Sequence, residues 1–286
     1  MKNKCFGFVM IIGRFNVGKS TLLNRMLGKK ISIVSSKRNT TIFPIAGVVK
    51  DDLYQCVYID TPGLYIQKKQ NIDYFKDVFL NVSISSSMIN IIFFVIDIYW
   101  THYDELIYNK LVRFYNNCQV ILIINKIDNF LQKSKVLPYI QFLSKKINFD
   151  EVVPISAKKN ININTLFEIV KKKLSKLKCY FPNEITVNYS NNFFASEIVR
   201  EKIMQYFWDE IPYSVVVKIE PFLIDKNFNN FCNIYGFVFV FCDMHKKMII
   251  GKEGRKIKKI IYFAKKDMEI VFSSRVNLKL CVKRMT

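Results

Sequence analysis

The strongest chemical signal in the sequence is a glycine-bounded segment near its start. Gly13–Ser20 reads GRFNVGKS, which has the glycines, the lysine and the hydroxyl of a phosphate-binding loop at the right spacing. The glycines let the backbone turn so that its N–H groups converge on phosphate oxygens. We expect the Lys19 ammonium to bridge the β- and γ-phosphates of a nucleotide and the Ser20 hydroxyl to bind Mg²⁺. The phosphate-binding residues expected from this segment are Gly13, Asn16, Val17, Gly18, Lys19, Ser20 and Thr21.

Three further fragments, each at the end of an apolar run, complete a nucleotide site. Asp60-Thr61-Pro62-Gly63 offers a carboxylate that holds Mg²⁺ through water and an N–H that senses the γ-phosphate. Asn125-Lys126-Ile127-Asp128 ends in a carboxylate that can accept from guanine N1–H and the N2 amine, whereas adenine has neither donor. Ser156-Ala157-Lys158 supplies a backbone contact to guanine O6. Together with the phosphate-binding loop, these fragments predict a guanine-nucleotide site.

Two threonines stand where the mobile segment that closes over Mg²⁺ and the γ-phosphate belongs. One of Thr40 and Thr41 is expected to bind the metal, and the pattern leaves open which. Leu64 follows Gly63 where a Gln could orient the attacking water, so we expect slow hydrolysis that depends on positioning and charge neutralisation. Asn16 either helps to hold a K⁺ ion or makes an ordinary loop hydrogen bond. The residues expected to act in hydrolysis are Lys19, Ser20, Thr40, Thr41, Asp60 and Gly63.

Alternating strand and helix patterns through residue 173 predict a mainly parallel sheet covered on both faces. The expected strands are Phe6–Ile12, Phe43–Lys50, Tyr54–Asp60, Ile89–Ile98, Val120–Asn125 and Val152–Ile155. The expected helices are Lys19–Leu27, Tyr103–Tyr115, Lys135–Ile147 and Ile163–Leu174. Each nucleotide-binding fragment directly follows one of these strands, so the sheet positions the site.

The second part of the chain has a different order of elements. Periodicity is lost from Ser175 to Asn192, where we expect a linker. After it come a helix, two strands, a short helix, a long helix and a strand, which predict a separate α+β domain. Their expected ranges are Ala195–Phe207, Tyr213–Glu220, Ile234–Cys242, a short helix before Gly251, Arg255–Met268 and Val276–Lys283. The expected domains are therefore residues 1–174 and 193–286, joined by a linker over 175–192.

Composition limits the partners and the compartment. Among 286 residues, Lys and Arg number 44 against 23 Asp and Glu, a net charge of +21 that favours nucleic acid first and an anionic membrane surface second. Seven cysteines without a Cys-x-x-Cys pair fit a reducing cytosol. The longest apolar run, Met88–Ile98, is too short to span a membrane. The only histidines, His102 and His245, lie beside no nucleophile pattern, which excludes Cys–His catalysis.

The basic charge is concentrated around a Gly-x-x-Gly turn. Residues 245–266 hold nine basic residues and one acid, and Gly251-Lys252-Glu253-Gly254 lies among them between two expected helices. Glycine at both ends lets a nucleic-acid backbone approach, and the next helix N-terminus can meet a phosphate. A plain interhelical turn would not need the basic cluster, so we favour the signature of a type II KH domain. The expected RNA-binding residues are Gly251, Lys252, Glu253, Gly254, Arg255, Lys256, Lys258 and Lys259.

These motifs, in this order, resemble the Era family of bacterial ribosome-assembly GTPases over essentially the whole chain. Further matching segments are Ile31–Ile33, Asp60–Leu64, Val153–Ala157, Ala195–Ile198 and Pro212–Val215. The resemblance implies a P-loop GTPase domain that uses GTP, GDP and Mg²⁺, followed by a KH domain that engages 16S rRNA near its 3′ end as the small (30S) ribosomal subunit matures. It also implies a cytoplasmic monomer with peripheral contact at the inner face of the membrane.

Three departures from the family pattern bear on activity. Phe15 stands where Pro is usual and Ile42 where an Arg commonly follows the paired Thr, so the timing of nucleotide turnover is expected to differ. The family continues beyond Thr286 into a tail that helps to form the RNA site, so we expect weaker base-level specificity. Two functional classes stay open: an enzymatic timer whose GTP state gates RNA binding, which we favour, and an RNA-binding assembly chaperone with structural nucleotide and little hydrolysis.

Overall fold

The computed structural model divides into two compact units, residues 1–32 with 41–188 and residues 33–40 with 189–286. It describes residues 4–35, 37, 40–41, 43–51, 54–64, 88–115, 118–130, 134, 136–174, 176–177, 190–208, 210–223 and 231–285. The division differs from the expected domain ranges in two respects: residues 33–40 join the second unit although both neighbouring segments belong to the first, and the boundary between residues 188 and 189 falls inside the expected linker. Ile42 and most of the expected linker lie outside the described residues.

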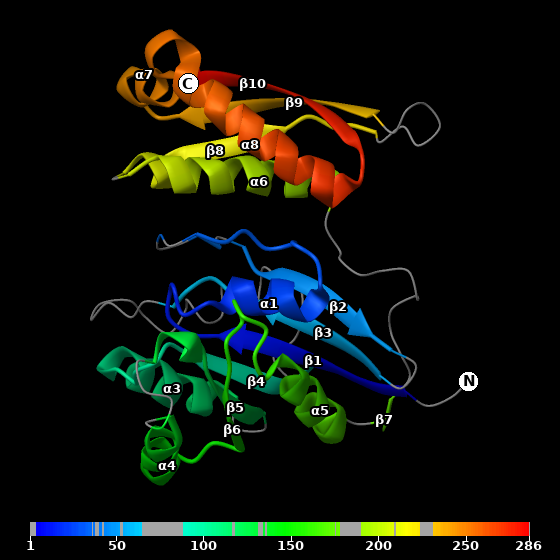
Figure 1. Cartoon of the computed structure of the whole chain (residues 1–286), viewed down its shortest axis with the longest axis vertical. Helices are drawn as coiled ribbons and strands as arrows, with labels where there is room; N and C mark the ends of the chain where they lie inside the picture. Colours follow the sequence, from blue (N-terminus) through cyan, green and yellow to red (C-terminus); the bar gives the residue numbers. More distant parts are fainter. Residues whose placement is uncertain are drawn as a thin grey trace. The chain divides into compact units, whose positions relative to one another are not determined.

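The first unit is built on a seven-stranded sheet of order β2-β3-β1-β4-β5-β6, with β7 paired to β1 (Figure 1). The strands are β1 (Lys4–Ile12), β2 (Ile45–Lys50), β3 (Tyr54–Asp60), β4 (Ile89–Ile96), β5 (Gln119–Ile124), β6 (Glu151–Pro154) and β7 (Lys176–Leu177). Pairing is parallel except for β2 against β3 and β7 against β1. The predicted mainly parallel sheet is confirmed, and β7 is a short strand within the expected linker.

Helices pack on both faces of this sheet. They are α1 (Lys19–Leu27), α3 (His102–Phe114), α4 (Val136–Lys146) and α5 (Ile163–Lys173). Val57 and Ile59 of β3 share one apolar cluster with α3 and α4, whereas Tyr58 between them meets Phe167 of α5, with ring centroids 6.4 Å apart. Successive strand residues point to opposite faces, so this alternation shows that both faces are covered. None of the described helices is long and apolar enough to cross a membrane.

Strand ends fall within about two residues of their expected positions, for local reasons. The expected strand at Phe43 begins at Ile45, because Pro44 has no N–H to donate to a ladder. The expected strand through Ile98 ends at Ile96, because the Asp97 carboxylate accepts from the backbone N–H of Ile98 at 2.5 Å and turns the chain. The first of these strand ends lies four residues after Thr41, and the second lies directly before Asp97, which pairs with Lys126.

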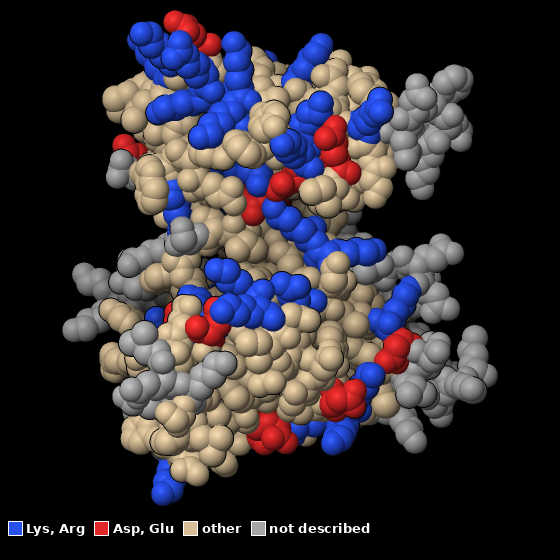
Figure 2. Space-filling view, in the orientation of Figure 1, with Lys and Arg blue, Asp and Glu red and all other residues tan. Residues whose placement is uncertain are grey.

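The second unit is a three-stranded sheet of order β10-β9-β8 with three helices. Its elements are α6 (Asn191–Tyr206), β8 (Val215–Ile219), β9 (Phe231–Val240), α7 (Asp243–Ile250), α8 (Arg255–Phe272) and β10 (Arg275–Arg284). β9 runs antiparallel to β8 and parallel to β10. The predicted α+β order is confirmed. Lys and Arg side chains gather over α7 and along α8 (Figure 2).

One face of the three-stranded sheet builds the core of this unit. Cys232, Ile234, Val238 and Val240 alternate along β9 and pack in one cluster with the buried side of α6 and α8. The residues between them are exposed or half-buried, so the burial of β9 has the two-residue period of a strand with one covered face.

Candidate functional site

The phosphate-binding loop joins β1 to α1, and a glycine allows its close approach to another fragment. Gly18 has φ 98° and ψ 27°, a left-handed conformation that side chains rarely adopt, and it caps the N-terminus of α1. A Cβ at this position would lie 2.3 Å from Nδ2 of Asn125, which donates to the Val17 carbonyl at 2.8 Å. The loop and the fragment at residues 125–128 are therefore held against each other.

Lys19 lies buried within this loop. Its Nζ donates to the carbonyl oxygens of Gly13 at 3.0 Å and Arg14 at 2.8 Å. Burial lowers the pKa of Lys19 to about 8, although Asp60 raises it and Arg14 adds to the lowering. Because the ammonium is poorly hydrated, an anion placed beside it would stabilise the charged form strongly.

Four oxygen-bearing side chains meet next to Lys19. Asp60 Oδ2 accepts from Ser20 Oγ at 2.6 Å and from Ser32 Oγ at 2.9 Å, and Ser20 Oγ lies 3.0 Å from Thr41 Oγ1. Asp60 is fully buried, and its Oδ1 has no hydrogen-bond partner among the described residues. Burial also raises the pKa of Asp60, against the lowering effect of Lys19. A buried carboxylate oxygen without a partner, beside the hydroxyls of Ser20 and Thr41, fits a hard divalent cation such as Mg²⁺.

Metal binding here would depend on hydroxyls and on phosphate. Within the part of the chain that the structure describes, no group of three or more His, Cys, Asp or Glu side chains could hold a metal ion. Mg²⁺ in nucleotide sites characteristically uses one or two protein oxygens together with phosphates and water, so the set of Ser20, Thr41 and Asp60 is of the right kind.

The two candidate threonines have separate surroundings. Thr41 is buried beside Ser20, whereas the Thr40 hydroxyl donates to the Lys37 carbonyl at 2.8 Å. The Thr40 carbonyl accepts from the Arg200 guanidinium of α6. The structure therefore brings Thr41, and not Thr40, to the Ser20 hydroxyl.

The fragments expected to read the base are joined by side-chain hydrogen bonds. Asn125 Oδ1 accepts from the backbone N–H of Lys126 at 2.8 Å and of Ala157 at 3.0 Å. Ser156 Oγ donates to Asp128 Oδ1 at 2.6 Å, and this bond lowers the pKa of the Asp128 carboxyl. The Asp128 side chain is thereby kept ionised and oriented, as a carboxylate that accepts from guanine must be.

The remaining predicted residues lie around this arrangement. The Thr61 hydroxyl donates to the Ile11 carbonyl at 2.8 Å, and Leu64 N–H donates to the Gly13 carbonyl at 3.1 Å, so Pro62 and Gly63 run beside the phosphate-binding loop. Thr21 is half-buried in the first turn of α1. Lys158 is exposed, and its carbonyl accepts from Arg25 at 3.0 Å.

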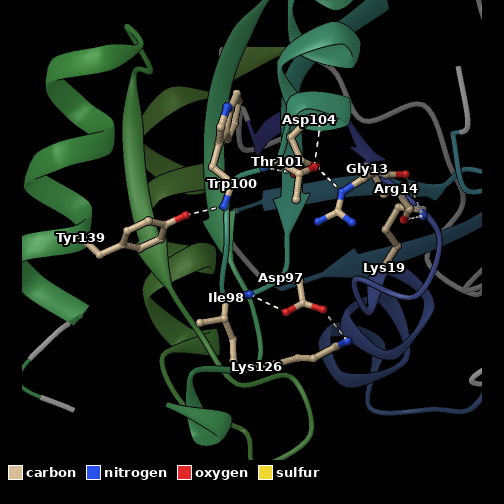
Figure 3. Close-up of polar contacts among 10 residues, drawn as sticks. All are labelled: Gly13, Arg14, Lys19, Asp97, Ile98, Trp100, Thr101, Asp104, Lys126 and Tyr139. Atoms are coloured by element: carbon tan, nitrogen blue, oxygen red, sulfur yellow. Dashed lines mark hydrogen bonds and ion pairs between the residues drawn. The ribbon is translucent and has the colours of Figure 1, made fainter. Parts of the chain in front are cut away.

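Two ion pairs that the sequence did not suggest anchor the loop (Figure 3). Arg14 Nε donates to Asp104 Oδ1 at 2.7 Å, and Asp104 is the buried third residue of α3. Lys126 Nζ donates to Asp97 Oδ2 at 2.9 Å and to the Asn16 carbonyl at 2.6 Å. The Thr101-x-x-Asp104 spacing signals a capping box, and both of its hydrogen bonds are present. That signal predicts a helix start but not a contact 90 residues away in the chain.

The Gly-x-x-Gly turn of the second unit is exposed. Gly251 and Gly254 have φ of 71° and 72°, and Glu253 between them has φ 54°, so the turn uses three left-handed residues to end α7 and start α8. The basic side chains around it point to solvent: Lys252, Arg255, Lys256, Lys258 and Lys259. Arg255 pairs with Glu253 at 2.9 Å, and Lys256 and Lys259 lie over the rings of Phe207 and Tyr206. Exposed cations around a helix N-terminus can exchange such surface contacts for phosphates.

Buried polar residues of α6 bind the backbone of Val34 and Thr40. Glu201 Oε1 accepts from the Val34 N–H at 3.2 Å, and Arg200 binds both Thr40 and the Glu197 carboxylate. The Lys37 ammonium lies 4.6 Å from the Trp208 ring centroid. Sequence reasoning missed these residues, and the available signal was the run of charged residues inside an otherwise apolar helix.

Comparisons with known proteins agree with this geometry. A family model described as a 50S ribosome-binding GTPase matches residues 8–126, and a KH-domain model matches residues 210–284. GTPase Era proteins of Yersinia pestis (strain Pestoides F) and Yersinia pseudotuberculosis (serotype O:1b, strain IP 31758) are each 45% identical over 280 residues, which is 97% of this chain and 90% of the relative.

Two solved structures superpose on almost the whole chain. One is a crystal structure of Era with MgGDPNP and nucleotides 1506–1542 of 16S ribosomal RNA, with TM-score 0.88, 36% identity and coverage of 99% of this chain and 94% of the other. The second is an Aquifex aeolicus Era variant bound to GDP·AlF4⁻, with TM-score 0.88, 36% identity and coverage of 98% and 94%.

Proposed function

The chain belongs to the Era family of GTPases, and on that basis we propose that its GTP state gates binding to 16S rRNA near the 3′ end as the small ribosomal subunit matures. The observation that carries the proposal is the meeting of four separate fragments at one oxygen-rich, lysine-containing site. The same chain carries a KH unit with an exposed basic turn.

The phosphate end of the site is assigned to Lys19, Ser20, Thr41 and Asp60. Lys19 would exchange its two carbonyl acceptors for phosphate oxygens, which regain the charge stabilisation that burial removes. Bound Mg²⁺ supplies charge neutralisation for the phosphate oxygens. Thr41 rather than Thr40 is proposed as its ligand from residues 40–41, supported by the 3.0 Å contact between Thr41 and Ser20.

Guanine recognition is assigned to Asp128, with Asn125 as a positioning residue. The Ser156 hydrogen bond supports an ionised Asp128, and Asn125 connects the base fragment to the phosphate-binding loop through Val17. The turn that would meet guanine O6 carries the N–H groups of Ala157 and Lys158, of which the Ala157 N–H donates to Asn125 Oδ1 in this structure. Adenine is disfavoured, because it would leave the Asp128 carboxylate without donors.

Hydrolysis is proposed to depend on positioning and charge. Leu64 is buried, so its apolar side chain orients no water, and the N–H groups of the loop and of Gly63 remain as the donors to phosphate. Asn16, with φ 61°, is proposed to help hold K⁺ through its side chain, because its carbonyl already accepts from the Lys126 ammonium. Replacing KCl by NaCl at constant ionic strength should slow hydrolysis, and equal rates would leave Asn16 with a structural role only.

RNA binding is assigned to the Gly-x-x-Gly turn and the basic start of α8. The exposed lysines and Arg255 support phosphate contacts. The chain is proposed to act as a cytoplasmic monomer. The net charge of +21 also supports peripheral contact with an anionic membrane surface. Cosedimentation with vesicles of phosphatidylglycerol tests that contact, and recovery of all protein in the supernatant would contradict it.

The timer is tested by single-turnover GTP hydrolysis with and without the 16S 3′ fragment, combined with binding to small subunits in GTP and GDP. We expect RNA to stimulate hydrolysis and GTP to tighten subunit binding. If RNA leaves the rate unchanged and both nucleotides give equal binding, the alternative holds: an assembly chaperone in which nucleotide is structural.

A further inference from the structure

The three-stranded sheet of the second unit has one face that its own helices do not cover. α6 and α8 pack on the face that carries Ile234 and Val238, and the side chains of the other face remain exposed or half-buried. We call this second surface the open face. The side chains that matter on it are Tyr235, Phe237, Phe239, Lys218, Lys279 and Lys283.

A row of aromatic rings runs along the middle of the open face. Tyr235, Phe237 and Phe239 alternate along β9, the central strand, and Tyr235 is 44% exposed. The Phe237 and Phe239 ring centroids are 5.9 Å apart. Strand geometry separates alternate residues by about 6.6 Å, which is roughly twice the 3.4 Å between stacked nucleotides of one strand. The row therefore matches bases that have come apart from one another, as in a flexible single strand.

Lysines flank the aromatic row on both neighbouring strands. Lys279 pairs in register with Tyr235, Lys283 with Phe239, and Lys218 of β8 with Phe237. The Lys279 Nζ atom lies 5.6 Å from the ring centroid of Tyr235. The Lys283 Nζ atom lies 4.0 Å from the ring centroid of Phe237, and the Lys218 Nζ atom lies 5.8 Å from that of Phe239. Over the described strands 215–219, 231–240 and 275–284, no Asp or Glu occupies a position on this face.

We propose that the open face is a second contact surface for single-stranded RNA, in which bases stack on Tyr235, Phe237 and Phe239 while the flanking lysines contact phosphates. Aromatic rings between cations provide both parts of sequence-tolerant single-strand binding, the stacking platform and the charge. On binding, each lysine leaves the ring that it covers for a phosphate, and a base takes its place over that ring.

Charge and geometry favour RNA over two other occupants. A second copy docked by a two-fold axis would bring the rows of lysines together, and like charges disfavour such an interface. An anionic bilayer fits less well, because Phe237 and Phe239 are half-buried beneath the lysines and do not reach beyond them into acyl chains.

The open face is separate from the Gly-x-x-Gly turn. The turn starts α8, whose buried side packs on the opposite face of the sheet. The proposal extends the RNA-binding role proposed above, but it does not require that the turn binds RNA. The two surfaces can therefore be disabled independently.

The test uses the full chain and a fluorescein-labelled twelve-residue oligouridylate, followed by fluorescence anisotropy. Tyr235→Leu/Lys279→Ala removes one ring and its paired charge, and we expect affinity to fall about tenfold, as loss of a stacking platform does. The same fall should appear in the Gly254→Asp background. The control Phe142→Leu/Lys145→Ala removes an exposed ring and an exposed lysine from α4 and should bind like the parent.

The outcomes separate the two proposals. If Tyr235→Leu/Lys279→Ala leaves oligouridylate affinity unchanged, both in the parent chain and in the Gly254→Asp variant, the open face does not bind RNA. If Gly254→Asp leaves affinity unchanged while Tyr235→Leu/Lys279→Ala lowers it, the assignment of the turn is wrong instead. Loss of vesicle cosedimentation or of self-association, with RNA affinity unchanged, would also overturn the proposal. Should the double variant not fold by circular dichroism, Lys218→Ala/Lys283→Ala removes charge alone and should still weaken binding.

Discussion

The lysine of the nucleotide site and the lysines of the proposed RNA-binding surfaces differ in burial. Lys19 is buried, holds two backbone carbonyls and has a pKa lowered to about 8. Lys252 and Lys258, beside the Gly-x-x-Gly turn, are exposed. A buried charge makes few interactions that are each specific and large, whereas exposed charges make many that are small, additive and screened by salt. The site therefore selects one ligand, and the surface accepts a class of ligands.

Lys19→Ala should have the largest effect, because it should abolish the difference between the buried lysine and the exposed ones. It removes the buried charge that would meet the phosphates, and loss of charge-assisted hydrogen bonds there should cost about 3 kcal/mol or more of GTP binding or of transition-state stabilisation. Calorimetric titration and single-turnover hydrolysis measure the loss. Oligouridylate binding should be unchanged, and a variant that hydrolyses GTP at the parental rate would refute the role given to Lys19.

Thr41→Ala and Thr40→Ala form a matched pair at adjacent positions. Thr41 lies beside Ser20 and Thr40 does not, so only Thr41→Ala should raise the Mg²⁺ concentration needed for half-maximal hydrolysis, by about tenfold. A Mg²⁺ titration of both variants gives the answer. Equal shifts, or a larger shift for Thr40→Ala, would contradict the proposed ligand.

Asp128→Asn should change the preferred base. The amide no longer accepts from N1–H and N2 of guanine, and leaving those donors without a partner should weaken GTP by about 2 kcal/mol or more. Xanthine nucleotides should bind better, because the amide can donate to the carbonyl that replaces the N2 amine. Unchanged GTP affinity in calorimetry would exclude Asp128 from the base site.

Ser156→Ala should show how much the Ser156 hydrogen bond to Asp128 contributes to nucleotide affinity. The Ser156 hydroxyl lowers the pKa of Asp128 in the folded protein. The stabilisation from this hydrogen bond is therefore complete at pH values above the ordinary pKa of an aspartate, and it is lost as the pH falls through the lowered pKa. Without the hydroxyl, GDP affinity should drop by about 1 kcal/mol at neutral pH. Its acid decline should begin at a higher pH, measured by fluorescent nucleotide titration, and identical pH profiles would argue against the coupling.

Lys258→Ala should give the smallest effect and the most salt-dependent one. Loss of one phosphate contact should lower the salt slope of single-stranded RNA binding by about 0.7 units and weaken binding a few-fold for any sequence. Lys172→Ala, an exposed lysine of α5, is the control and should leave the slope unchanged. A loss confined to one RNA sequence would show base readout in place of a phosphate contact.

Prediction from sequence succeeded where function lies in contiguous fragments. Residues 13–20, 60–63 and 125–128 carry their own turn chemistry and directly follow strands, so their types and spacing predicted a nucleotide site at the ends of those strands. The order of helices and strands after residue 192, together with the Gly-x-x-Gly turn, likewise identified the second domain. Each of these signals is local, because backbone geometry relates residues a few positions apart.

Contacts between distant segments needed the tertiary structure. The sequence alone determined that a guanine nucleotide, Mg²⁺ and a polyanion were the expected ligands, and it narrowed the metal-binding threonine to two adjacent positions. Only the folded chain separated Thr41 from Thr40, joined Arg14 to Asp104 and Arg200 to Thr40, and set Lys279 beside Tyr235. The reason is physical: pairing of this kind depends on which elements pack together and in what register, and no spacing along a single segment encodes it.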